Sequence, residues 1–328
     1  MKNRRWIALT IAIVLIFMSI GIRFTTFIAS GFFSGMFDLE EGVYEELPVR
    51  EGDPTSKIAI VNLDGAIMDL GPQGIFGAGY DHDQLLLQLE QAFTDEFVEG
   101  VILQVNSPGG GVHETAEIHR LIVELQEEYE KPLYVSMGGM AASGGYYVAA
   151  TADKIFAEAT TLTGSIGVIM ESLNYAGLAE EYGIKFNTIK SGKHKDIMSP
   201  SREMTAEERE IMQSMIDEMY DEFVRVIVDG RQLDEKTVRK IGDGRIYTGK
   251  QAQEVSLVDE IGSLDDTIDN LMSDYELDGS AVVTYSSDLS FLALISTSVQ
   301  NLVQGKSEIQ FIHNLLIESD QPRAMYMY

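Results

Sequence analysis

One serine of the sequence lies in surroundings that suit a nucleophile. Ser143 stands in MAASGGY, after an apolar run that predicts a strand and at the start of a short predicted helix. Small neighbours leave room for a substrate, and the amino terminus of a helix stabilises developing negative charge. The segment is not a G-x-S-x-G elbow, because Ala141 occupies the first glycine position. Simple helix capping by Ser143 explains the pattern equally well.

A nucleophilic serine needs a base, and the five histidines offer no compelling one. His113 and His119 lie six residues apart on a predicted helix and share no face for a metal. His82 stands between two aspartates in a predicted loop. A solvated surface position is favoured for all the histidines, including His313, although His194 stays open as a base.

Lysine is the other base that the sequence offers, because burial can lower the pKa of a lysine toward neutrality. Lys190, Lys193 and Lys195 cluster in IKSGKHKDIMSPS, after a predicted strand over 184–190. Spacing does not choose among them, and a basic surface loop gives the same pattern.

Glycine-rich turns provide candidate backbone donors. The loop NSPGGG at 106–111 follows an apolar strand, and its glycines let N–H groups point outward to a phosphate or an oxyanion. A tight turn is the simpler interpretation of the glycines alone, and neither the P-loop nor the dinucleotide pattern occurs here. Ser165 in TGSIG places a hydroxyl in a second glycine-flanked turn.

These segments require a scaffold of alternating strands and helices, which predicts an α/β fold with mainly parallel strands. A long helix near 205–229 begins with a possible capping box of Thr205 and Glu208, and apolar residues at four-residue steps predict one packed face. The other expected strands are 57–65, 100–111, 132–139 and 154–158, and the other expected helices are 83–95, 113–129 and 142–151.

Charge and composition set the context of this domain. The chain has 328 residues, no cysteine and a net charge of −28, which excludes disulfides and disfavours nucleic-acid binding. Residues 1–6 form a basic head, and 7–28 predict a transmembrane anchor with its amino terminus inside the cell. We expect an acidic linker over 29–54, a globular domain over 55–290, and a carboxy-terminal segment with a flexible tail over 291–328. A cleaved signal peptide is the rival interpretation of the apolar run.

Taken together, NSPGGG, MAASGGYY, TGSIGV and SGKHKDIMSPSREMT resemble the signal peptide peptidase A family of membrane-anchored serine peptidases, over about residues 57–262. The resemblance implies a crotonase-like superhelical α/β fold, shared with the Clp protease. It implies Ser143 as nucleophile, Lys195 as general base and Ser165 as the residue that orients Lys195. Gly110 and Gly144 match the backbone donors of the oxyanion hole.

The implied reaction is amide hydrolysis of signal peptides left in the membrane after secretion, by a catalytic domain outside the cytoplasm and without a metal or organic cofactor. The short, single-repeat form of the family implies a ring-shaped homo-oligomer. In the two-repeat members the Ser and the Lys lie on different repeats, which leads us to expect active sites shared between neighbouring protomers. Two other classes stay open: a crotonase-type acyl-CoA enzyme and a non-catalytic membrane scaffold.

Overall fold

The computed structural model describes residues 44–69, 80–286 and 324–327. A nine-stranded sheet organises these residues, with strand order β1-β10-β2-β3-β5-β6-β9; β7 pairs with β5, and β8 pairs with β7. The strands of this sheet are β1 (Glu46–Arg50), β2 (Asp53–Asp64), β3 (Val98–Ser107), β5 (Leu133–Ala142), β6 (Lys154–Ala157), β7 (Leu162–Gly164), β8 (Ile246–Thr248), β9 (Glu260–Ile261) and β10 (Ser280–Tyr285).

The centre of the sheet is parallel, because β10, β2, β3, β5, β6 and β9 pair in parallel along the series. Alternate residues of β2 supply two separate cores. Ala59 and Val61 belong to the larger core on one face, and Ile58 and Ile60 belong to the smaller core on the other. Both faces of a parallel sheet are normally covered in this way. The predicted α/β fold with parallel strands is therefore confirmed.

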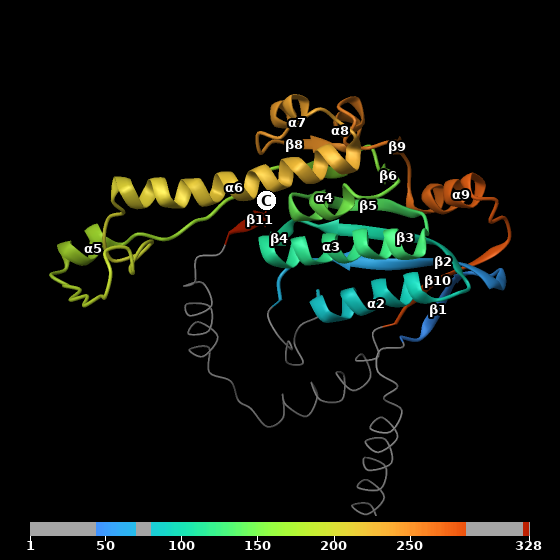
Figure 1. The fold of residues 1–328 in the computed structure, drawn as a ribbon, viewed down its shortest axis with the longest axis horizontal. Helices are drawn as coiled ribbons and strands as arrows, with labels where there is room; N and C mark the ends of the chain where they lie inside the picture. Colours follow the sequence, from blue (N-terminus) through green and yellow to red (C-terminus); the bar gives the residue numbers. More distant parts are fainter. Residues whose placement is uncertain (1–43, 70–79, 287–323, 328) are drawn as a thin grey trace, which may run out of the picture. The chain divides into compact units, whose positions relative to one another are not determined.

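Helices cover both faces of the sheet (Figure 1). The larger core takes in residues of α2, α3, α4 and α6, and the smaller core takes in residues of α9. The described helices are α2 (His82–Thr94), α3 (Val112–Tyr129), α4 (Gly144–Ala149), α5 (Ala176–Glu181), α6 (Ala206–Arg231), α7 (Glu235–Ile241), α8 (Gly249–Glu254) and α9 (Leu264–Asp274).

The long helix α6 divides into a buried half and an exposed half. Thr205 and Glu208 form the predicted capping box, and Phe223 and Ile227 are fully buried in the larger core. Ile211 and Met215 are exposed, so the predicted packed face is wrong for the first half of the helix. That half extends away from the sheet together with α5 (Figure 1), and we call residues 170–216 the arm.

Three sequence-based expectations need correction. Residues 184–190 form no strand, because they pair with no strand of the described chain. The predicted linker over 29–54 ends earlier, because Glu46–Arg50 pairs with the distant β10 as an edge strand. The predicted flexible tail contains a strand, β11 (Met325–Met327), which pairs with β4 (Gly109–Gly111). Both of these pairings join residues far apart in sequence, which local composition does not reveal.

The anchor predicted for 7–28 lies outside the described residues. Within the described ranges, no helix combines the length and the apolar character needed to cross a membrane.

Candidate active site

Ser143 occupies a sharp turn between the end of β5 and the start of α4. Its backbone has φ 51° and ψ −115°, a conformation that side-chain-bearing residues seldom adopt. Ser143 holds the N-cap position, but its hydroxyl makes no capping hydrogen bond. Its Oγ is buried and has no hydrogen-bond partner within the described part of the chain. Because its backbone is strained and its hydroxyl does not cap the helix, Ser143 is better explained by a functional role than by capping.

Backbone N–H donors surround this serine on two sides. The N–H groups of the first turn of α4, including that of Gly144, have no intrahelical acceptor. A Cβ on Gly144 would lie 3.2 Å from the nitrogen of Gly110, so the two glycine backbones are neighbours. A Cβ on Gly110 would overlap Ile67 O at 1.9 Å, which makes glycine necessary there. The predicted pair of oxyanion donors is therefore brought together beside Ser143.

Ser165 lies next to the same turn. The N–H of Ser143 donates to Gly164 O at 2.7 Å, and Ser165 follows that glycine directly. Its backbone also has a positive φ of 51°, and its N–H donates to Arg245 O at 2.8 Å. Its side chain is buried and makes no hydrogen bond with another described residue.

Strand β11 lies along the glycine-rich loop. Met325, Tyr326 and Met327 pair antiparallel with Gly111, Gly110 and Gly109, and Ile169 bridges to Met325 from the other side. The site therefore contains an extended segment of backbone flanked on both edges. The Tyr326 ring is buried against Tyr147 and Phe223, and its hydroxyl donates to Met219 O at 2.9 Å.

The three candidate lysines lie on the arm, and two of them are paired with acids. Lys190 donates to Asp196, and Lys193 donates to Glu207. Lys195 makes no ion pair or side-chain hydrogen bond with any residue in the described ranges, and it is exposed. It is therefore the lysine whose amino group is available for another role.

Lys195 does not reach Ser143 of the same chain. Its loop packs at the first turn of α6, where His194 contacts Glu207 at 3.3 Å. Phe223, which contacts Tyr147 of α4, lies sixteen residues further along α6, roughly 24 Å at 1.5 Å per residue. Figure 1 shows the arm extending away from α4. The structure thus brings Ser143, Ser165, Gly110 and Gly144 together and leaves Lys195 apart.

Two histidines are more buried than the sequence indicates. His82 is buried, hydrogen-bonded to Tyr80, with Glu117 at 3.1 Å from its Nε2, so its predicted surface position is wrong. His119 packs against Tyr147, and burial lowers its pKa to about 4. His313 lies outside the described residues. No cluster of three or more His, Asp or Glu side chains suited to a metal occurs among those described.

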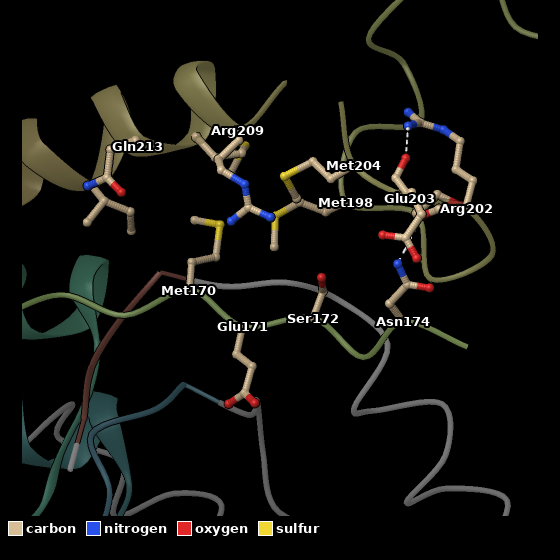
Figure 2. Close-up of a pocket in the computed structure, with 13 residues that line it drawn as sticks. Met170, Glu171, Ser172, Asn174, Met198, Arg202, Glu203, Met204, Arg209 and Gln213 are labelled. Carbon is tan, nitrogen blue, oxygen red and sulfur yellow. Dashed lines mark hydrogen bonds between the residues drawn. The ribbon is translucent and has the colours of Figure 1, made fainter. Parts of the chain in front are cut away.

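Two further features were not predicted from the sequence, one beside Ser143 and one on the arm. Thr115 Oγ1 is buried without a partner in the described chain, and it would lie 2.7 Å from a Cβ on Gly144. Its position four residues after the glycine run is the available sequence signal. The second feature is a pocket of about 360 Å³ on the arm, into which Arg209 projects (Figure 2). Its apolar lining consists of Met170, Met198, Met204, Met212 and Ile216.

Comparison with known proteins gives consistent matches. The model of peptidase family S49 matches residues 126–278. The chain is 38% identical over 347 aligned residues to a putative signal peptide peptidase SppA of Enterococcus faecium, covering 100% of this chain and 99% of that protein. It is 43% identical to a putative protease of Methanocaldococcus jannaschii, over 60% of this chain and 63% of that protein. Protease 4 of Haemophilus influenzae is 32% identical, over 83% of this chain and 46% of that protein.

Proposed function

The chain belongs to peptidase family S49 and is a serine peptidase of the signal peptide peptidase type, and from this premise we propose that it hydrolyses remnant signal peptides with a Ser143–Lys195 dyad. The observation that carries the proposal is the strained turn at Ser143, whose buried hydroxyl has no partner among the described residues and lies beside glycine backbone donors.

The proposed reaction follows from these positions. Neutral Lys195 accepts the proton of Ser143 as Oγ attacks the scissile carbonyl, and the N–H groups of Gly110 and Gly144 hold the oxyanion. Lys195 then returns the proton to the leaving amine, and water releases the acyl group. Ser165 donates or accepts a hydrogen bond that orients Lys195.

Strand pairing supports a peptide as the substrate. Met325–Met327 already lies antiparallel to Gly109–Gly111, so an extended backbone of peptide geometry fits beside Ser143. Strand addition is a common mode of peptide recognition, and a peptide substrate would take the edge of Gly109–Gly111 that β11 occupies here. An acyl-CoA substrate has only the two amides of its pantetheine arm, which lack the regular spacing of a peptide backbone.

The arm supports a site completed by a second protomer. The unpaired segment 184–190 exposes Ile184, Phe186 and Ile189, which is fully exposed, and Leu173 and Tyr182 are also largely exposed. Exposed apolar groups of this extent favour a protein interface. We propose that neighbouring chains in a ring cover this surface, so that Lys195 of one chain is buried beside Ser143 and Ser165 of the next. Burial disfavours the charged form of a lysine, as a general base requires.

The remaining parts of the proposal concern location and fold family. A transmembrane anchor over 7–28, with its basic head inside, places the catalytic domain outside the cytoplasm, close to the apolar peptides that it degrades. The parallel sheet and the turn between β5 and α4 are compatible with a crotonase-like superhelix of the Clp protease type.

Covalent labelling tests the proposal. A fluorophosphonate probe should label the full-length protein at Ser143, and a synthetic signal peptide should slow the labelling. Ser143→Ala should lose both labelling and hydrolysis, while Ser286→Ala, a serine outside the site, keeps both. Turnover of the peptide by Ser143→Ala, or thioester turnover by the unmodified protein, would contradict the assignment.

A further inference from the structure

Arg202 binds two carboxylates, that of Asp196 within the Lys195 loop and that of Glu208 on α6. Its Nε and Nη2 donate to Oδ2 and Oδ1 of Asp196 at 2.9 and 2.7 Å, and Nη2 also donates to the Asp196 carbonyl at 2.9 Å. Toward Glu208, Nη1 and Nη2 donate to the two carboxylate oxygens at 2.8 and 2.6 Å. One guanidinium thus ties the loop to α6 through both of its edges.

The Glu208 end of this contact is anchored firmly. Glu208 is only 2% exposed, and its carboxylate accepts the N–H of Thr205 at 3.0 Å in the capping box of α6. Hydrogen bonds from Arg202 and Thr205 lower the pKa of Glu208 to about 2. The acid is therefore ionised at every pH at which the enzyme could work, and it fixes Arg202 to the helix.

The Asp196 end is joined directly to the proposed base. Asp196 follows Lys195 in the chain, and the turn around it is closed by backbone hydrogen bonds from Lys195 to Gly192 and from Ser199 to Asp196. Hydrogen bonds from Arg202 and Lys190 hold the pKa of Asp196 well below its usual range. Lys195 itself has no partner in the described chain, so nothing but this turn orients its side chain.

We propose that Arg202 is a positioning residue, which fixes the turn of Lys195 to α6 and thereby sets the direction in which the Lys195 amino group projects. The inference rests on the proposed role of Lys195 as general base. Arginine suits this task better than lysine, because its planar fork can bind two carboxylates at once.

The consequence is a specific kinetic effect. A base displaced by about 1 Å can lose on the order of 100-fold in rate, although the substrate still binds. Arg202→Met should therefore lower kcat by about 10- to 100-fold and change KM by less than about threefold.

Arg239→Met is the matched control. Arg239 also bridges two carboxylates, those of Glu235 and Asp221 at 2.7 and 2.8 Å, but it lies on α7, away from the loop. It should keep full activity. Arg202→Lys should recover part of the lost kcat, and added guanidinium ion should raise the rate of Arg202→Met but not that of Arg239→Met.

A second variant guards against simple misfolding. Arg202→Met removes the cation that pairs with the buried carboxylate of Glu208, and the unpaired charge could unfold the arm. Arg202→Met with Glu208→Gln removes that charge, keeps a capping-box residue and leaves Asp196 paired with Lys190. This double variant should keep the oligomeric mass and melting temperature of the parent enzyme and still show the loss of kcat.

The rate of fluorophosphonate labelling separates the inference from the proposed function. Lys195→Ala should slow labelling of Ser143, and adding Arg202→Met should slow it no further, because both changes remove the same aligned base. If Lys195→Ala labels normally, the proposed dyad is wrong. If Lys195→Ala is slow while Arg202→Met and the double variant work at the parent rate, the dyad stands and the positioning role of Arg202 is overturned. A further loss in the combined variant also overturns it.

Discussion

The sheet region and the arm differ in burial and in the contacts that stabilise them. Around Ser143 the sheet region is closed: Ala141, Tyr146 and Val148 are fully buried, and the strained turn is held by neighbouring strands. The arm buries little apolar surface, and charged pairs hold its loop together. The proposed nucleophile, Ser143, is thus buried within one chain, whereas the proposed base, Lys195, is exposed on the arm. The contrast supports our proposal that a neighbouring chain completes the site.

Variants of the proposed dyad should show the largest loss of activity. Ser143→Ala and Lys195→Ala should each lose at least about 100-fold in peptide hydrolysis, because one lacks the nucleophile and the other lacks the base. Both should melt normally, since neither the Ser143 hydroxyl nor the Lys195 amino group makes a hydrogen bond or ion pair with another described residue. Lys190→Ala and Lys193→Ala should keep a substantial fraction of the activity.

Rings assembled at random from equal amounts of the two inactive variants should regain activity at roughly one site in four, as a head-to-tail contact requires. Subunit mixing is verified by mass spectrometry of differently tagged chains. Verified mixed rings without activity would show that each dyad forms within one chain.

The sequence predicted the sheet region well because local patterns determine it. Apolar runs locate β2, β3 and β5, and glycine spacing locates the turns at Gly110 and Gly144. Pairing between distant segments is not encoded locally. Strand β1 (Glu46–Arg50) pairs with the distant β10, and β11 pairs with the distant Gly109–Gly111. For this reason β1 and β11 were not predicted.

The arm was predicted less well for a physical reason. The stripe of α6 that contains Ile211 and Met215 has the spacing of a core face, but these two residues remain 38% and 40% exposed in the described chain. An apolar face predicts burial without indicating which molecule provides it. Likewise, the resemblance to a peptidase family selects Lys195, whereas spacing alone does not; the ion pairs of Lys190 and Lys193 favour the same choice.

Charges placed on the arm should break the assembly and leave the sheet region folded. Phe186→Asp and Ile189→Asp put a carboxylate on residues that we expect to be buried between protomers. Light scattering should show a shift toward the monomer mass, and hydrolysis should fall at least about tenfold, because buried unpaired charge is strongly disfavoured. The control is Leu87→Asp, on the exposed side of α2, which should change neither mass nor activity. Full-sized rings in the Phe186→Asp and Ile189→Asp variants would exclude this surface as the interface.

Acid should weaken the sheet region before the arm. Burial lowers the pKa of His119 to about 4, so the unfolded chain binds a proton first as the pH falls. Stability from a neutral His119 is therefore complete above its ordinary pKa of about 6.5 and declines down to about pH 4, by at most about 3 kcal/mol. The pKa of Glu208 is lowered to about 2, so the stability that its carboxylate contributes is complete above its ordinary pKa of 4.5 and is lost as the pH falls from there toward 2.

Melting curves between pH 4 and pH 7 check this order. His119→Phe keeps the ring contact with Tyr147 and should flatten the pH dependence of stability, whereas His113→Phe, at an exposed position on the same helix, should leave it unchanged. Limited proteolysis of the arm should not change over that range. If His119→Phe leaves the pH dependence of stability unchanged, this histidine does not cause it.

The smallest effect distinguishes two hydroxyls at the end of β7, those of Thr163 and Ser165. Thr163 Oγ1 donates to Ala141 O at 2.6 Å, so this bond stabilises the sheet region of a single chain. The Ser165 hydroxyl has no partner in the described chain, and we propose that it contacts Lys195 of a neighbouring chain. Ser165→Ala should therefore lower kcat by about two- to tenfold, the value of one hydrogen bond of about 0.5–1.5 kcal/mol, without changing the melting temperature. Thr163→Val should instead lower the melting temperature. If Ser165→Ala destabilises the fold and leaves kcat unchanged, Ser165 is structural, because the bond that it forms then lies within one chain.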